Sequence, residues 1–227
     1  MIFVDVVGWF ADAGNWTGAD GMLMRLGEHL WITVRVVLIA CLIAVPLGLA
    51  VGHTGRGGLG LVGITNAMRA LPTLGLVTFL FLLYPSGELS TLVALVVLAV
   101  PPVLAGTYAG VQSIEPQVLD AARGMGMTGL QRLVQAELPG SLPLLVGGVR
   151  SAVLQVVATT VVAAYVGVGG LGDPLLVGLA IRDYIQVVAV ATLTAALAVV
   201  LDLLLAAVQR LVVPKGLRLA RVSVGAT

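Results

Sequence analysis

Residues 115–139 read EPQVLDAARGMGMTGLQRLVQAELP, and they form the one long polar stretch in a chain that is otherwise rich in apolar residues. Pro116 suits the first position of a helix, because its fixed φ and missing N–H cost little there. Gly124 and Gly126 predict the end of that helix. Thr128 predicts the N-cap of a second helix, with Gln131 at capping-box spacing. The stretch therefore predicts a helix, a glycine bend and a second helix.

The second helix is expected to be amphipathic. Its apolar residues recur at i, i+3, i+4 and i+8, which places them on one face of a helix. They are Leu130, Leu133, Val134 and Leu138. We expect this helix pair to lie in water, between two apolar segments.

The composition of the chain is that of an integral membrane protein. Of its 227 residues, 59% are hydrophobic and only 10% are charged, and the mean hydropathy is +1.10. These values lie far above those of a soluble domain of this size. A net charge of +1 without a basic stripe gives no reason to expect nucleic acid as a partner. Cys41 is the only cysteine, so no disulfide can form within the chain.

Five apolar stretches are long enough to cross a hydrocarbon core of about 30 Å, at about 1.5 Å per residue. They cover residues 30–51, 59–83, 91–108, 142–166 and 185–208. Asn66, Arg69 and Pro72 interrupt the second stretch, so we expect its first third to pack against protein. The sequence predicts an all-α integral membrane protein with about five transmembrane helices.

The distribution of Lys and Arg predicts the orientation. Arg210, Lys215, Arg218 and Arg221 follow the last span, and positive residues favour the cytoplasmic side. The predicted organisation is an extracytoplasmic segment at residues 1–29, a transmembrane domain at residues 30–210 and a cytoplasmic tail at residues 211–227. Loop 115–139 is then cytoplasmic. The first segment is expected either to pack on the helices or to lie on the membrane surface.

The order of residues in this loop resembles the cytoplasmic loop of the permease subunits of ABC importers. That pattern is E-A-A, three residues, G, nine residues and I-x-L-P. The matching positions are Asp120, Ala121, Ala122, Gly126, Ala136, Leu138 and Pro139. Two of them depart from the pattern, because Asp120 stands for Glu and Ala136 for a bulky apolar residue. The first change keeps the charge and shortens its reach.

Further blocks resemble the osmoprotectant importers among these permeases. They read AVPLGLAVG at residues 44–52, ALPTLGLVTFL at 70–80, DAARGMGMT at 120–128 and VGVGGLGD at 166–173. The resemblance covers about residues 30–205. The last block is expected to be a tight turn against the third span, or a contact for a docked binding protein.

The resemblance implies a methionine-importer-like type I ABC permease fold with a cytoplasmic coupling-helix loop. It implies a transport subunit, not an enzyme, that imports osmoprotectants such as glycine betaine, choline or carnitine across the cell membrane of a prokaryote. The implied partners are cytoplasmic ATPase subunits that hold ATP and Mg, a second permease subunit of identical or related sequence, an extracytoplasmic solute-binding protein and membrane lipid. No cofactor is expected in this chain. Import of an amino acid or methionine, and a channel or scaffold role, remain alternatives.

Residues for coupling to the ATPase follow from the matched loop. They are Asp120, Ala121, Ala122, Arg123, Gly124, Gly126, Glu137, Leu138 and Pro139. The small residues allow a close approach between helices, and Asp120 near the start of its helix is favoured by the helix dipole. No catalytic motif and no set of metal ligands is expected.

A tight binding cage for a quaternary ammonium solute would use aromatic faces, but the few aromatic residues lie mostly near the ends of spans. We therefore expect a weakly polar translocation pathway instead. Its candidates are Asn66, Thr73, Thr78, Gln155, Thr159 and Thr160. Arg150 and Asp202 are predicted to lie at matching depth in the fourth and fifth spans, where a buried charge needs a partner. We expect them to form an ion pair, with Arg69 as the rival partner and with Arg150 reaching the surface alone as the alternative.

Overall fold

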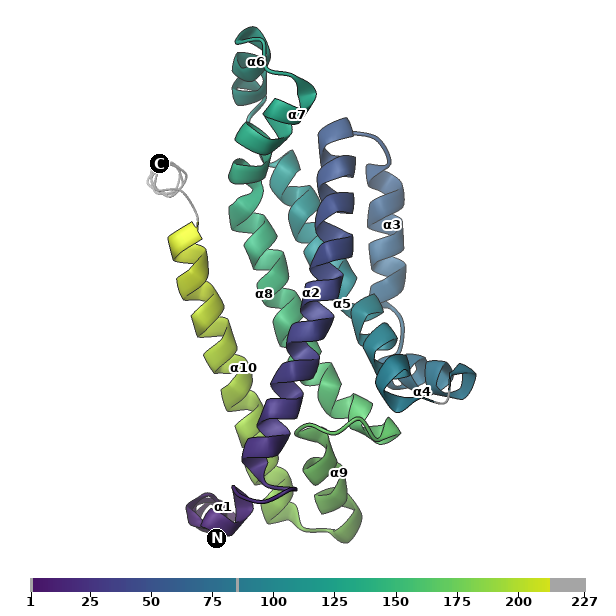
Figure 1. Ribbon diagram of the computed structural model, residues 1–227, viewed down its shortest axis with the longest axis vertical. Helices are drawn as coiled ribbons and strands as arrows, with labels where there is room; N and C mark the ends of the chain where they lie inside the picture. Colours follow the sequence, from purple (N-terminus) through teal and green to yellow (C-terminus); the bar gives the residue numbers. More distant parts are fainter. Residues whose placement is uncertain (1, 85, 213–227) are drawn as a thin grey trace. The chain divides into compact units, whose positions relative to one another are not determined.

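The structure of the protein is a computed structural model that describes residues 2–84 and 86–212. Within these residues every regular element is a helix (Figure 1). The chain divides into two compact units. Unit 1 consists of Met1–Ile39, Ala70–Ala99 and Val153–Asp202, and unit 2 of Ala40–Arg69, Val100–Ala152 and Leu203–Thr227.

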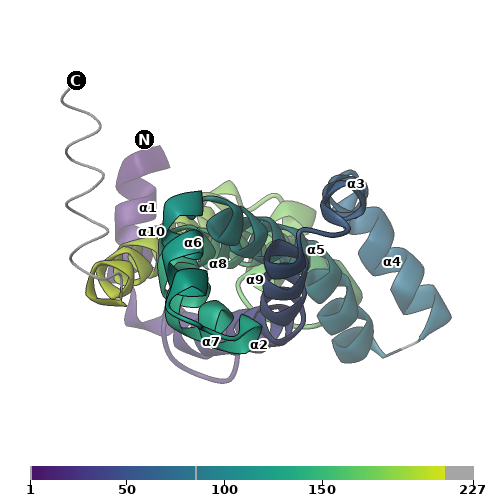
Figure 2. The same ribbon diagram turned by 90° about the horizontal axis from the view of Figure 1, so that it is seen from above.

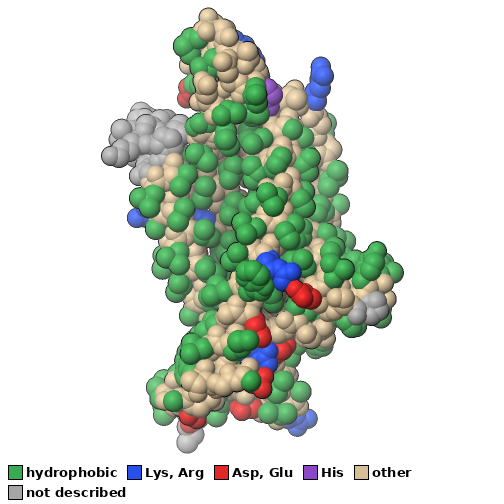
Figure 3. Space-filling view, in the orientation of Figure 1, with side chains coloured by type: hydrophobic (Ala, Val, Ile, Leu, Met, Phe, Trp, Pro, Cys, Tyr) green, Lys and Arg blue, Asp and Glu red, His purple; other side chains and the backbone are tan. Residues whose placement is uncertain are grey.

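The long helices are α2 (Met22–Thr54), α5 (Gly87–Gln112), α8 (Leu138–Ala163) and α10 (Tyr184–Val212). Among the described residues, four helical segments are long and apolar enough to cross a membrane. A fifth is added if α3 (Gly58–Arg69) and α4 (Thr73–Leu83) count as one bent span. Hydrophobic side chains cover most of the face seen in Figure 3. The predicted all-α membrane fold with about five spans is confirmed.

The second predicted span, residues 59–83, is not one straight helix. The chain leaves the helical conformation between α3 and α4, and Pro72 precedes α4 in an extended conformation, with φ −69° and ψ 119°. A proline also disfavours helical dihedrals in the residue before it. The sequence identified Pro72 as an interruption of this stretch, and the break between the two helices confirms it.

The fourth predicted span, residues 142–166, lies within a longer helical segment that the sequence did not predict. A continuous helical segment runs from Gly129 to Val166. A π-helix at Leu133–Glu137 joins α7 (Gly129–Arg132) to α8, and the Leu138 N–H bonds to the Leu133 carbonyl. The wider π-turn relieves the clash that Pro139 would otherwise make with the carbonyl four residues earlier.

Glycines let the helices of unit 2 approach each other closely. A Cβ added to Gly106 would lie 2.7 Å from the Leu144 carbonyl oxygen, and one added to Gly148 would lie 2.6 Å from the Pro102 carbonyl oxygen. These distances leave no space for a side chain between α5 and α8. Small residues at helix contacts are the usual basis of close packing inside membranes.

Unit 1 has an apolar cluster around Met22, Leu171 and Val190. Trp9 of α1 (Ile2–Ala11) packs against this cluster, so the N-terminal segment is a helix held on the unit. Leu171 directly precedes α9 (Gly172–Ile181). The Gly-rich block therefore forms a turn that leads into a further helix, which the sequence did not predict.

The predicted division into an N-terminal segment, a transmembrane domain and a cytoplasmic tail stays a prediction. Helix α2 begins at Met22, so it crosses the predicted boundary between residues 1–29 and 30–210. Helix α10 is described as far as Val212, and the rest of the predicted tail, with Lys215, Arg218 and Arg221, lies outside the described residues.

Candidate functional site

The loop at residues 115–139 begins with two short helices that lie side by side at one end of unit 2 (Figures 1 and 2). Helix α6 (Pro116–Gly124) has its proline in the first turn, as predicted. The chain then turns through Gly126, whose φ of +78° favours glycine. The predicted capping box is confirmed: the Thr128 N–H donates to Gln131 Oε1 at 2.8 Å, and the Gln131 N–H donates to Thr128 Oγ1 at 3.3 Å.

An exposed apolar surface covers this helix pair. It consists of Val118, Met125, Leu130 and Val134, whose side chains are 46–71% exposed. We call these four residues the loop surface. Two of them, Leu130 and Val134, belong to the predicted amphipathic face. An apolar patch on an otherwise polar loop indicates a contact surface for another protein.

The predicted coupling residues occupy different environments. Asp120 and Arg123 form an exposed ion pair at 2.8 Å. Ala121 is exposed, whereas Ala122 is buried. Gly124 ends α6 and Gly126 lies in the bend, and a Cβ at either position would meet open space. Leu138 and Pro139 begin α8 and are half-buried.

Glu137 differs from the other coupling candidates because it is only 2% exposed. Arg132 Nε donates to its Oε1 at 2.7 Å, and His53 Nδ1 lies 2.6 Å from its Oε2. Because an ionised carboxylate only accepts hydrogen bonds, His53 Nδ1 is the donor. Arg132 also faces His53 Nε2 at 3.5 Å. We call these three residues the Glu137 clamp.

The Glu137 clamp ties the loop to the end of α2. His53 lies in the last turn of α2, 84 residues before Glu137 in the sequence. Beside it, Gln112 Nε2 donates to the Gly52 carbonyl at 3.1 Å and so satisfies one of the last carbonyls of α2. A cavity of about 310 Å³ lies next to the clamp, and its lining includes Leu119 and Asp120 of α6.

A second cluster of polar contacts holds the Gly-rich turn in unit 1. Gly167, Gly169 and Gly170 all have positive φ values between 76° and 85°. The Gly170 N–H donates to Glu28 Oε2 at 2.8 Å, and the Leu171 N–H donates to His29 Nδ1 at 3.3 Å. The turn therefore lies against the start of α2, as well as near Gly87 at the start of α5.

His29 is completely buried beside this turn. Its Nδ1 accepts a hydrogen bond from the backbone, and its Nε2 lies 3.1 Å from the Val157 carbonyl oxygen. These contacts fit a neutral imidazole with its proton on Nε2. Both ring nitrogens are thus used by the backbone, so His29 is a structural residue and not a ligand.

A network of ion pairs surrounds Arg25 in the same unit. Its guanidinium lies 2.7 Å from Asp20, 3.0 Å from Glu28 and 3.2 Å from Asp173. Burial raises the pKa of Asp173, and the neighbouring Arg25 acts in the opposite direction. We call these four residues the Arg25 network.

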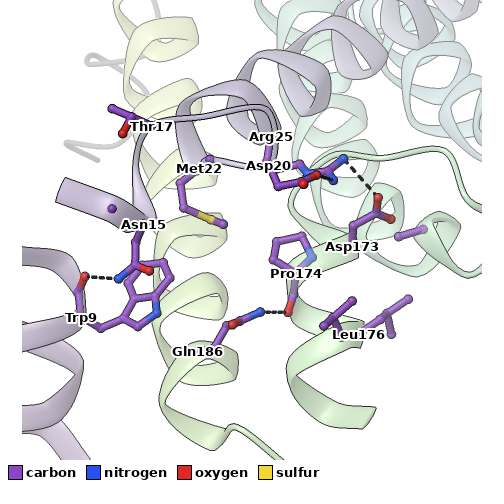
Figure 4. A pocket seen from close by; sticks show the side chains of 14 residues that line it. Trp9, Asn15, Thr17, Asp20, Met22, Arg25, Asp173, Pro174, Leu176 and Gln186 are labelled. Atoms are coloured by element: carbon purple, nitrogen blue, oxygen red, sulfur yellow. Dashed lines mark hydrogen bonds and ion pairs between the residues drawn. The ribbon is translucent and has the colours of Figure 1, made fainter. Parts of the chain in front are cut away.

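The Arg25 network borders a cavity of about 670 Å³, the interior of which is seen in Figure 4. Trp9, Asn15 and Gln186 also line it. Asn15 Nδ2 donates to the Trp9 carbonyl and Gln186 Nε2 donates to the Pro174 carbonyl. These bonds join Asn15 to α1, and Gln186 of α10 to α9. The ion pair of Arg25 with Asp173 joins α2 to α9.

The candidates for the translocation pathway are divided between the units. Asn66 lies on α3 in unit 2, and the other candidates lie on α4 and α8 in unit 1. Gln155 Nε2 donates to the Leu98 carbonyl at 3.0 Å. The hydroxyl of Thr160 donates to the Val156 carbonyl, and Thr160 is buried. Thr73, Thr78 and Thr159 are more accessible. Their role in the pathway stays a prediction.

The predicted ion pair between Arg150 and Asp202 also stays a prediction. Arg150 belongs to unit 2, where its Nη1 donates to Gln209 Oε1 at 2.9 Å. Asp202 belongs to unit 1.

One ion pair within the membrane helices was missed. Arg35 of α2 lies 2.5 Å from Glu88 of α5, and its guanidinium lies 5.6 Å from the centre of the Trp31 ring. A cation inside a predicted span is the sequence signal that could have indicated it. Among the described residues, no group of three or more His, Cys, Asp or Glu side chains could hold a metal ion.

Comparison with known proteins finds a matching family and similar permeases. A family model described as "binding-protein-dependent transport system inner membrane component" matches residues 44–216. The glycine betaine/carnitine/choline transport system permease protein OpuCB of Bacillus subtilis is 32% identical over 89% of this chain and 93% of its own length. The osmoprotectant import permease protein OsmW of Salmonella typhimurium is 34% identical over 84% of this chain and 91% of its own.

Among solved structures, the inward-facing MetNI methionine ABC transporter has a similar fold. In one crystal form it matches with a TM-score of 0.74 and 23% identity, over 85% of this chain and 97% of that chain. At this identity the likeness concerns the fold alone. The family match covers most of the chain, and the helices are those of a multi-pass membrane protein. The chain belongs to the family of binding-protein-dependent transport system inner membrane components.

Proposed function

We propose that this chain is the permease subunit of an ATP-driven ABC importer for osmoprotectants such as glycine betaine, choline or carnitine. The observation that carries the proposal is the helix pair α6–α7, with its confirmed capping box and its exposed loop surface. The relatives named as osmoprotectant permeases support the class of solute.

The partners follow from the family. A cytoplasmic ATPase that holds ATP and Mg would contact the loop surface, and closure of the ATPase on ATP would move α6. A solute-binding protein outside the cell would deliver the solute, and a second permease chain, of identical or related sequence, would complete the pathway. This chain would supply the coupling surface and one half of the pathway.

The proposed orientation places loop 115–139 in the cytoplasm and the N-terminal segment outside. In a variant without Cys41, a cysteine at the exposed Leu130 should react with a membrane-impermeant thiol reagent only after the cells are permeabilised. A cysteine at the exposed Thr17 should react in intact cells. The opposite result would reverse the orientation.

The function is tested by reconstituting the chain with its ATPase and binding protein in liposomes. We expect ATP-dependent uptake of at least one of glycine betaine, choline and carnitine. Met125→Glu and Leu130→Glu should prevent co-purification of the ATPase, because each places a charge in the apolar loop surface. Uptake of methionine but not of these three solutes would contradict the proposed class of solute. Uptake without ATP would contradict the importer itself.

A further inference from the structure

Glu137 is the feature of the loop that contact with an ATPase does not explain. It is 2% exposed, so it is not available to a docking protein. A buried carboxylate without partners is strongly unfavourable, and it persists only when it is well bonded. Both of its oxygens are bonded here, to His53 and to Arg132. These contacts lie inside unit 2, between the loop and the end of α2.

The backbone is also specialised at this position. Glu137 is the last residue of the π-helix at Leu133–Glu137. A π-helix is rare and often lies at a functional site, because the extra residue in the turn changes where the following side chains point. In this loop the extra residue directs Glu137 toward α2 while Val134 remains on the exposed surface.

Helix α6 is connected to this point. It packs against both α7 and the π-helix, and the Met127 N–H donates to the Ala122 carbonyl at 3.1 Å. The lining of the cavity of about 310 Å³ includes α6 residues as well as His53, Arg132 and Glu137. Helix α6 therefore has free space next to it, and the Glu137 clamp is a direct polar connection from this loop to α2.

We propose that the Glu137 clamp is the positioning element that transmits movement of the coupling loop to α2. Arg132 and Glu137 carry the movement of the loop, and His53 passes it to residues 40–54 of α2. The clamp acts after the ATPase has docked, so its loss uncouples ATP hydrolysis from transport but does not prevent assembly. This inference rests on the proposed function, in which α6 contacts the ATPase.

The test uses the complete transporter in liposomes and measures uptake of radiolabelled glycine betaine, choline and carnitine together with ATP hydrolysis. Glu137→Gln keeps the shape of the side chain but removes its charge, which weakens both charge-assisted hydrogen bonds. We expect normal co-purification of the ATPase and a fall in solute transported per ATP of about fivefold or more, the range of typical coupling between sites.

The matched control is Glu115→Gln. Glu115 is exposed and precedes α6, and its side chain makes no capping hydrogen bond. The same chemical change at this position should leave the ratio of transport to hydrolysis as in the wild type. His53→Gln is the second variant, because His53 is partly accessible and its replacement is compatible with folding even if Glu137→Gln is not.

A double variant separates a shared role from two independent ones. If His53 and Glu137 act as one connection, Glu137→Gln combined with His53→Gln should lower the ratio no further than the worse single change. If the effects of the two single changes multiply in the double variant, or if uptake and hydrolysis fall in equal proportion, the proposed role of the Glu137 clamp is wrong. The proposed importer function would not be affected by that result. If the wild-type complex neither binds the ATPase nor transports any of the three solutes, the proposed function fails and the clamp inference falls with it.

Discussion

The Glu137 clamp and the Arg25 network both attach a distant segment to α2 through a glutamate, but they do so in different environments. Glu137 is buried, with one arginine and one histidine as partners. Glu28 is 30% exposed in its side chain, and it shares Arg25 with two aspartates. The first attachment depends on two strong bonds to a carboxylate that is almost fully buried, whereas the second spreads its charge over several groups in contact with water.

The largest difference should appear when each glutamate is truncated. Glu137→Ala leaves Arg132 and His53 without their buried partner, and we expect a loss of about 3 kcal/mol in the free energy of unfolding. Glu28→Ala leaves Arg25 with two carboxylates, and we expect a loss of about 1 kcal/mol. Denaturant unfolding of the purified chain in detergent, followed by tryptophan fluorescence, measures both. Equal losses would remove the distinction between the two regions.

Alanine should destabilise the two glycine turns by different amounts, because the space around the two glycines differs. A Cβ at Gly170 would be strained by a φ of +76° and would lie 3.2 Å from His29 Nδ1, whereas a Cβ at Gly126 would be strained by its φ alone. We expect Gly126→Ala to cost about 1 kcal/mol, and Gly170→Ala to cost more. Gly124→Ala is the control, because Gly124 is helical with open space around it. It should cost nothing, and the order of the three unfolding midpoints tests the comparison.

Salt should increase the difference in stability loss between the variants of the Arg25 network and of the Glu137 clamp. Raising the ionic strength from 0.1 M to 1 M shortens the Debye length from about 10 Å to about 3 Å. The cost of Glu28→Ala should then decrease, since water reaches the Arg25 network. The cost of Glu137→Ala should stay the same, because buried pairs are screened much less. Unfolding curves of both variants at the two salt concentrations provide the measurement, and a parallel decrease would argue that solvent reaches the clamp.

The smallest effect is expected at Asp173. Burial raises the pKa of Asp173 despite the attraction of Arg25, so the folded environment on balance disfavours the ionised carboxylate. Asp173→Asn should therefore change the free energy of unfolding by roughly 0.5 kcal/mol or less. A raised pKa also means that the folded state binds this proton more readily than the unfolded chain does. Acidification through that pKa should not reduce stability through Asp173, and a loss that requires Asp173 would contradict the assignment.

Local sequence rules predicted the parts of the fold that depend on neighbouring residues. The capping box needs only Thr128 and Gln131, three residues apart, and the bend at Gly126 needs only a backbone without a Cβ. Apolar length predicted the spans for the same reason. These features form wherever the local sequence permits them, so no partner element has to be known.

The parts that were missed depend on distant contacts. The burial of Glu137 follows from His53, and nothing near Glu137 in the sequence indicates that partner. The early start of α2 was hidden because Arg25, Glu28 and His29 argue against a membrane helix in the sequence alone. In the structure their polar groups are bonded to Asp173, Gly170 and Leu171. The π-helix has no recognisable local signature, so the continuous helix through Pro139 was not predicted.

The π-helix also makes the length of this loop as important as its residues. Each residue of an α-helix turns the chain by about 100°. Deleting one residue within Leu133–Glu137 would convert the wide turn into a regular one, because a π-turn holds one more residue than an α-turn. The helices on either side would keep their directions, but the wide turn that brings Glu137 to His53 would be lost. The nine residues between Gly126 and Ala136 are thus a fixed count. Substitutions on the outer face are compatible with it, but an insertion or deletion in the regular helical turns on either side of the π-helix would rotate the loop surface by about 100° relative to α8.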